Sequence, residues 1–388
     1  MSAFNVNGHF KFFPVGQGLF YGGCISSSAP RTKPFAFVYD CGTEDAWNNY
    51  LTTSISNFPT FVPNVSINHL DLVVVSHLHK DHFSGVYQLI KTVGTPRRII
   101  LPLIEGDRLT IEIVIYSLFI FDNNISNKQE IINTFLRYYL EAETLSSDGS
   151  KLSFSNIEED SNSSKSFMIA KDTYNSSLIY GADKIWNFNF FTGFIGRKNI
   201  SVIQQIKTDI LALLNKYNCK SIQDLLNVPG IDAFKLLQSI YINNGFKSGC
   251  SLNNTSTLLL HYPYVASLVT QIYCFHNLGY HTHFHLATLL TGDSKINKNQ
   301  ACLLNDCLNG VQPAYLITQL PHHGSNDNFK SLSKYLWTFI INGLCVASYG
   351  TGNTYGHPGK LAVHSLAMNQ LMKVNEHQDF LYSICYRR

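Results

Sequence analysis

One stretch, residues 72–82 (LVVVSHLHKDH), limits most strongly what this chain of 388 residues can fold into. Its apolar start predicts a short buried strand. Four metal-ligand side chains follow: His77, His79, Asp81 and His82. In an extended segment, side chains two positions apart point to one side, so His77 and His79 can hold one ion together. Asp81 and His82 follow once the chain begins to turn, so they can reach a second ion. Imidazole and carboxylate ligands favour Zn²⁺, with Mn²⁺ or iron as alternatives.

Two later apolar segments also end in residues that bind metals. Residues 289–291 lead into Gly-Asp at Asp293, and residues 316–321 lead into His322 and His323. Adjacent side chains in an extended segment point opposite ways. We therefore expect one of the two histidines to bind a metal and the other to face the substrate. We favour His323 as the ligand and His322 as the residue near the leaving group, and the reverse assignment is the alternative.

Two further residues at strand ends are candidates for supporting roles. Asp40 ends a predicted strand at residues 35–42 (FAFVYDCG). Beside a metal site, it is a candidate for orienting a metal ligand through a hydrogen bond. His357 stands between a glycine and a proline, after a predicted strand at residues 345–350. We expect it to contact the substrate or donate a proton, and a late metal ligand is the alternative.

As a set, these segments resemble the metallo-β-lactamase-like domain of ComEC-like competence proteins. The resemblance is carried by VGQG at 15–18, Asp-Cys-Gly at 40–42, HLHKDH at 77–82, Gly-Asp at 292–293, HHGS at 322–325 and NTYGHP at 353–358. That family usually has an aspartate on each side of VGQG. Pro14 and Leu19 stand at those places here, so the role of those carboxylates does not carry over.

The resemblance implies an α+β fold of a particular kind. This fold is an αββα sandwich, in which two sheets pack face to face, helices lie outside and metals bind at one edge. We expect residues 1–388 to form a single domain of this kind. Residues 104–250, where the family pattern is lost, would form an insertion that is loop-rich at first and then helical. Within it, Ser221 and Asp232 are predicted helix N-caps.

The resemblance also implies a metal-dependent hydrolase that binds two divalent ions, Zn²⁺ first and Mn²⁺ second. The implied metal ligands are His77, His79, Asp81, His82, Asp293 and His323, with Asp293 bridging the ions. The implied catalytic residues are Asp81, His322 and His357, beside a hydroxide bound between the two ions. We expect a phosphodiesterase or nuclease that acts on DNA. The alternatives are a small-molecule hydrolase (a phosphorylcholine-esterase-like phosphodiesterase or a lactonase) and a non-catalytic binding or regulatory module.

Composition sets weaker limits on partners and location. A net charge of +3 is too mild to indicate nucleic-acid or membrane binding by itself. We find no secretory signal and no convincing membrane span. The nine cysteines form no C-x-x-C pair, so we expect a cytoplasmic protein with free thiols. Charged residues are only 14% of the chain, which is compatible with a protein partner or a homo-oligomer.

Other parts of the chain are less specific. Residues 83–93 and 361–374 have the composition and spacing of helices. His281, His283 and His285 alternate, so they share one face of a predicted strand. That spacing permits metal binding, but we favour a half-buried aromatic strand face.

Overall fold

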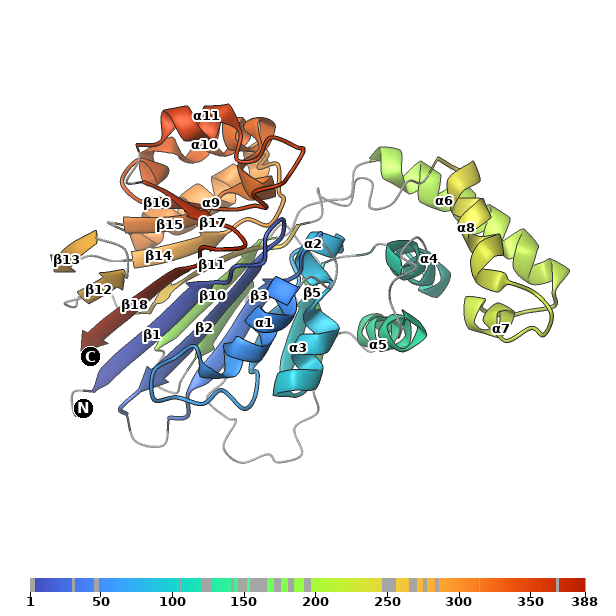
Figure 1. Ribbon diagram of the computed structural model, residues 1–388, viewed down its shortest axis with the longest axis horizontal. Coiled ribbons are helices and arrows are strands. Elements are labelled where there is room, and N and C mark those ends of the chain that lie inside the picture. The colour runs from blue at the N-terminus through green and yellow to red at the C-terminus, as the bar shows by residue number, and fades with distance from the viewer. Residues whose placement is uncertain are drawn as a thin grey trace.

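The structure, a computed structural model, describes residues 4–29, 32–44, 49–102, 104, 106–119, 128–140, 143–145, 152–153, 166–170, 176–180, 185–191, 197–245, 256–264, 271–274, 278–282, 286–313, 315–367 and 370–387. These residues form two mixed β-sheets with helices around them, in agreement with the predicted α+β class (Figure 1). Within these described ranges, no helix combines the length and the apolar character needed to cross a membrane.

The first sheet has ten strands in the order β13-β12-β18-β1-β2-β3-β4-β5-β8-β6. In chain order these are β1 (Asn5–Phe12), β2 (Phe20–Ser27), β3 (Phe35–Cys41), β4 (Leu72–Val74), β5 (Arg98–Leu101), β6 (Glu143–Leu145), β8 (Ser166–Ala170), β12 (Gln271–Cys274), β13 (Leu278–Thr282) and β18 (Phe380–Arg387). Strands β3, β4 and β5 run parallel to one another. Strand β18 pairs antiparallel with β1, which brings the two ends of the chain side by side.

The second sheet has eight strands in the order β17-β16-β15-β14-β11-β10-β9-β7. In chain order these are β7 (Leu152–Ser153), β9 (Ser176–Tyr180), β10 (Trp186–Phe191), β11 (Leu258–Pro263), β14 (Leu286–Leu290), β15 (Tyr315–Gln319), β16 (Leu344–Ser348) and β17 (Leu371–Val374). Strands β14 to β17 run parallel, so their carboxyl ends meet at one edge of the sheet.

The two sheets pack against each other through a core that is rich in aromatic side chains. The ring centroids of Phe37 on β3 and Phe188 on β10 lie 5.0 Å apart, and those of Phe10 on β1 and Trp186 on β10 lie 5.4 Å apart. All four side chains are fully buried. Burying one such side chain contributes about 1.5–3 kcal/mol. Because this core covers the inner face of each sheet and helices cover the outer face, the strands have continuous apolar runs in the sequence.

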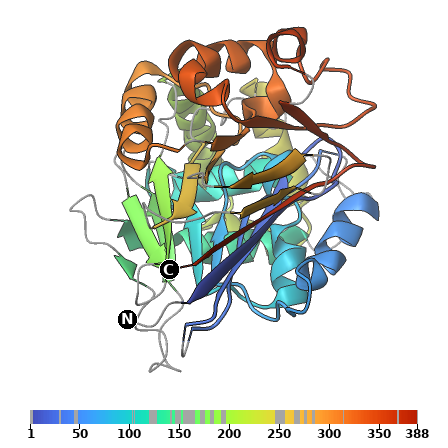
Figure 2. The same cartoon turned by 90° about the vertical axis from the view of Figure 1, so that its left-hand side faces the viewer.

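Helices cover the outer face of each sheet. The first sheet is covered by α1 (Asn49–Asn57) and α3 (Val86–Val93), which share a core cluster with β2 and β3. The second sheet is covered by α9 (Lys298–Val311), α10 (Asn326–Ile340) and α11 (Lys360–Ser365), which share a cluster with β11 and β14. Figure 2 shows these orange and red helices on the side of the sheets opposite the blue and cyan ones.

The range predicted as an insertion contains both helices and sheet strands. Its helices are α4 (Arg108–Phe119), α5 (Lys128–Leu140), α6 (Arg197–Lys216), α7 (Ile222–Leu226) and α8 (Ala233–Asn243), and they lie at one end of the molecule in Figure 1. The predicted caps are confirmed, because Ser221 accepts from the amide of Asp224 and Asp232 from that of Lys235. Strand β10, in the same range, is a central member of the eight-stranded sheet.

Two predicted helices differ from the structure. Instead of the one helix predicted over residues 83–93, the structure has the short α2 (Lys80–Phe83) followed, after a turn, by α3. The prediction of a helix over residues 361–374 is correct only for α11, because its last four residues form β17. This strand pairs with β16, and that pairing outweighs the helical preference of the segment LMKV.

Candidate metal centre

The carboxyl ends of β4, β14 and β15 deliver the candidate ligands to one place. His77 and His79 follow β4, and their ring centroids lie 4.7 Å apart. The backbone of His79 is extended. Helix α2 begins next, with the amide of His82 donating to the carbonyl of His79 at 2.9 Å. This turn brings Asp81 and His82 round toward the two preceding histidines. Asp293 follows β14, and the single turn η3 (Pro321–Gly324) follows β15.

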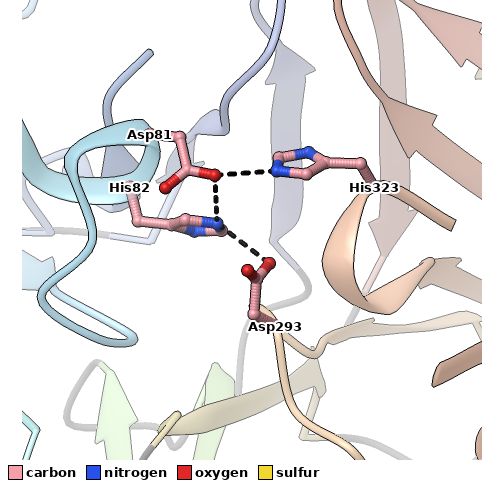
Figure 3. Close-up of side chains that lie close together, drawn as sticks. All are labelled: Asp81, His82, Asp293 and His323. Atoms are coloured by element: carbon pink, nitrogen blue, oxygen red, sulfur yellow. Dashed lines mark hydrogen bonds and ion pairs between the residues drawn. The ribbon is translucent and has the colours of Figure 1, made fainter. Parts of the chain in front are cut away.

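Two groups of side chains could each hold a metal ion. Asp81, His82, Asp293 and His323 form one group, and His77, His79 and Asp81 form the other. Within each group, the ligand atoms lie within 4.8 Å of one another. Asp81 belongs to both groups, so the two groups lie side by side. Figure 3 shows the four side chains of the first group pointing toward a common centre from three separate elements.

Distances within the centre show how Asp293 links the histidines. Its Oδ1 lies 3.0 Å from Nε2 of His82, and its Oδ2 lies 3.6 Å from Nε2 of His77. Nε2 of His323 lies 2.9 Å from Oδ2 of Asp81. The two oxygens of Asp293 therefore face different histidines. That arrangement suits a carboxylate that contacts two neighbouring cations.

Buried polar atoms in the centre fit a cation. Three polar atoms are buried without a hydrogen bond: Nε2 of His77, Nε2 of His82 and Oδ1 of Asp293. The last two lie 3.0 Å apart. A buried polar atom without a hydrogen bond costs about 1–3 kcal/mol. A divalent ion would satisfy imidazole nitrogens and carboxylate oxygens together. The donor set therefore fits a metal ion better than it fits an ion-free core.

Three histidines are oriented through their Nδ1 atoms, which leaves Nε2 facing the centre. Nδ1 of His82 donates to Oδ2 of Asp40 at 2.8 Å, and Nδ1 of His323 donates to the carbonyl of Ser348 at 2.6 Å. Nδ1 of His77 lies 3.0 Å from the hydroxyl of Ser76. Asp40 lies where the sequence predicted a supporting carboxylate. Contacts of this kind select the tautomer and the ring orientation of metal-binding histidines.

The dense packing of charged groups shifts their pKa values. Burial alone would lower the pKa of His82, but the carboxylates of Asp293 and Asp81 outweigh it and hold that pKa well above its usual value. The pKa of His77 falls well below its usual value because of burial and the neighbouring His82. Burial would raise the pKa of Asp293, but His82 reverses the effect and lowers it. The centre thus carries buried carboxylate charge that attracts a cation.

His322 and His357 lie at the rim of the centre. The side chain of His322 is 37% exposed, and its Nε2 lies 3.8 Å from Oδ2 of Asp293. The ring of His357 lies 5.2 Å from that of His322 and 5.7 Å from that of His323. Burial, together with His323 and His322, lowers the pKa of His357 to about 4. His323 belongs to the metal-ligand group, whereas His322 and His357 face the space around it.

The expectation of extended backbone at His322 and His323 is wrong. Both have positive φ angles, 51° and 55°, in the left-handed region. Such a backbone is unfavourable for residues with a side chain, and strain of this kind often marks functional sites. The two rings diverge because of this left-handed turn and because Ser348 holds the ring of His323. Strand alternation plays no part.

Two glutamines that support the centre were missed by the sequence analysis. Oε1 of the buried Gln319 accepts from the amides of Thr291 and Gly292, at 2.7 and 2.8 Å, and its Nε2 donates back to the carbonyl of Gly292. This shapes the turn that presents Asp293. Gln17 accepts from the amide of Gly350, and its Nε2 lies 3.4 Å from Nδ1 of His357. Amide side chains carry no metal-ligand signal, although the VGQG segment itself stood out.

The side chains of the alternating histidines His281, His283 and His285 lie outside the described residues, so their role stays open. No family model and no curated protein matches the chain.

Proposed function

We propose that this protein is a metal-dependent phosphodiesterase of the metallo-β-lactamase fold, with an αββα sandwich and a dinuclear centre. The observation that carries the proposal is the convergence of three buried atoms without a hydrogen bond, Nε2 of His77, Nε2 of His82 and Oδ1 of Asp293. A buried cluster of this composition is costly unless it binds cations. The layered arrangement of two sheets between helices adds support.

Each candidate ligand has a defined part in this proposal. One ion would be held by His77, His79 and Asp81, and the other by Asp81, His82, Asp293 and His323, with Asp293 also facing His77. Bound Zn²⁺ or Mn²⁺ would supply a water of lowered pKa and neutralise charge on the attacked phosphorus. Nδ1 contacts with Asp40 and Ser348 would keep His82 and His323 oriented toward the ions. The chain therefore fixes the orientation of these two ligands by itself.

The rim histidines are proposed to act on the substrate. His322 is half-exposed beside Asp293, so it can reach a phosphate oxygen or the leaving oxygen. His357 presents its ring from the opposite loop, with Nδ1 directed at Gln17. Nε2 of His357 is then the atom left to hydrogen-bond a substrate oxygen. These placements suit substrate contact more than metal binding for both residues.

DNA or another phosphodiester is the proposed substrate. Residues 294–367, which follow the centre and include α9 to α11, contain five lysines and two aspartates. A groove of about 330 Å³ between α10 and α11 is lined by Lys330, Lys334 and Trp337 together with Phe329 and Leu361. A basic and aromatic surface suits a polyanion that carries bases. Both helices begin next to the centre, because the amide of Gly359 donates to the carbonyl of Gly324.

Two other basic residues near the motifs are paired with carboxylates, so they add little positive charge to a DNA-binding surface. Arg97 pairs with Asp71 at 3.3 Å, and Lys91 pairs with Glu130 at 3.0 Å. A small phosphodiester therefore stays as the second candidate substrate, since it needs fewer cations than DNA.

The test is cleavage of linear and circular DNA by the purified protein with added Zn²⁺ or Mn²⁺. We expect cleavage that is lost on chelation and in Asp81→Ala and His82→Ala. His364→Ala changes an exposed histidine on α11 and should keep full activity. Turnover of a small phosphodiester without DNA cleavage would select the second candidate. Folded protein that binds metal and cleaves neither substrate would contradict the proposal.

A further inference from the structure

Tyr355 stands out at the rim of the metal centre. It keeps 60% of its surface exposed, the largest fraction among the large hydrophobic side chains that the structure describes. Its ring nonetheless stacks on His357, with centroids 5.7 Å apart and planes 25° apart. His357 in turn contacts the rings of His322 and His323. Tyr355 is thus separated from the candidate metal ligands by a single ring.

The position of Tyr355 is held from both sides of the rim. Its hydroxyl donates to Oε1 of Glu44 at 2.8 Å, and Glu44 follows β3, on the other sheet. The loop that carries Tyr355 is closed by Asn353, whose Nδ2 donates to the carbonyls of Gly350 and His357 and whose Oδ1 accepts from the amide of His357. A large aromatic ring is therefore both exposed and fixed. This arrangement lowers the entropy cost of stacking a ligand on the ring.

We propose that Tyr355 is a specificity-determining residue that stacks a nucleobase of the substrate next to the scissile phosphodiester. The inference rests on the proposed phosphodiesterase function and assigns its substrate class as nucleic acid with unpaired bases. Tyr355 keeps most of its surface exposed while its ring stacks on His357, and exposed aromatic side chains of this kind serve as platforms for base stacking. Because every base has a π-face, the contact would favour bases over a bare sugar-phosphate chain without reading sequence.

The alternative is that Tyr355 only closes the loop through its bond to Glu44. The two roles separate chemically, because loop closure needs the hydroxyl and stacking needs the ring. Tyr355→Phe removes the hydroxyl and keeps the ring. Tyr355→Ala removes both, and Glu44→Gln weakens the bond while leaving the tyrosine in place.

The experiment measures equilibrium binding of a fluorescent single-stranded phosphorothioate oligonucleotide, which resists hydrolysis, to the metal-loaded protein. The comparison ligand is the same backbone without bases. We expect Tyr355→Ala to raise Kd for the base-containing ligand by about 5- to 150-fold, the range that one stacked base contributes. Its Kd for the abasic ligand should stay within about twofold of wild type, and Tyr355→Phe and Glu44→Gln should stay close to wild type with both ligands.

Three results would overturn the inference. The first is an equal loss of affinity for both ligands in Tyr355→Ala, and the second is no loss of affinity for either ligand. The third is a loss of affinity in Tyr355→Phe as large as that in Tyr355→Ala. Binding is read without cleavage, so the two proposals fail separately. DNA cleavage with unaltered base-dependent binding in Tyr355→Ala would remove the stacking role alone. Base-dependent binding without any metal-dependent cleavage would remove the phosphodiesterase alone.

Discussion

Asp40→Asn tests whether the hydrogen bonds behind the centre prepare its histidines for metal. The carboxylate of Asp40 is fully buried. Its Oδ1 accepts from the amide of Ser76 at 2.6 Å, and its Oδ2 accepts from the hydroxyl of Ser76 and from Nδ1 of His82. Asparagine has nearly the same shape, but one of its two terminal atoms can only donate. The substitution therefore changes hydrogen-bond polarity with little change in packing.

The direction of the effect follows from which atom must accept. The amide of Ser76 can only donate, so the oxygen of the new asparagine must stay beside it. The NH₂ group then faces Nδ1 of His82, which can accept only if the imidazole proton moves to Nε2. Nε2 is the atom 3.0 Å from Asp293 in the centre, and a protonated Nε2 cannot bind a metal. Loss of such a supporting contact costs about 10- to 100-fold in metal affinity, or about 1.4–2.7 kcal/mol.

The assay is competition for Zn²⁺ against a chromophoric chelator, with circular dichroism to show that each variant is folded. Asp71→Asn is the matched control. Asp71 is also a buried aspartate that accepts a backbone amide, that of Ala36, but it precedes β4 and so lies at the end of that strand away from the centre. We expect wild-type affinity in Asp71→Asn and the stated loss in Asp40→Asn. Equal affinities in the two variants would contradict a role of Asp40 in preparing His82 for metal.

Two further predictions concern stability. Burial lowers the pKa of His261 to about 3, whereas histidine in the unfolded chain has a pKa of about 6.5. Between these two values the unfolded chain binds a proton that the folded chain does not. The free energy of unfolding should therefore decrease as pH falls, by about 2 kcal/mol at pH 5 relative to neutral pH. Urea denaturation at pH 7 and pH 5 should show this decrease in wild type and a smaller one in His261→Gln, and equal decreases would disprove it. Gln319→Leu leaves the amides of Thr291 and Gly292 without their acceptor and should lower the free energy of unfolding by about 2–6 kcal/mol. A decrease in the free energy of unfolding of less than about 1 kcal/mol, measured by urea denaturation, would show that the two amides find other acceptors and would contradict the prediction.

The strands that carry the centre were the most predictable part of this protein. A buried strand needs an apolar run, and a metal ligand needs a histidine or aspartate, so a run that ends in such residues is visible in the sequence. Residues 72–82 illustrate this, since both β4 and the turn after His79 follow the expected pattern. Spacing within one segment is sufficient for such inferences.

Features that depend on distant segments were not predictable in the same way. The contact of Gln319 with the turn before Asp293 joins two strands, and no local pattern marks it. The left-handed backbone of His322 and His323 is set by the turn after β15, and such a backbone is uncommon for any residue other than glycine. Strand β17 forms because β16 offers a free edge, which the helical spacing of residues 361–374 does not reveal.

The presence of a metal centre is tested by the metal content of the purified wild-type protein and of Asp293→Ala, measured by atomic emission after removal of loosely bound ions. We predict two divalent ions per wild-type chain, because the described residues form two ligand groups that share Asp81. We predict a clear loss of metal from Asp293→Ala, because Asp293 belongs to one group and lies 3.6 Å from His77 of the other. A folded wild-type chain that retains no metal, even after incubation with Zn²⁺ or Mn²⁺, would show that this cluster of histidines and aspartates is not a metal centre.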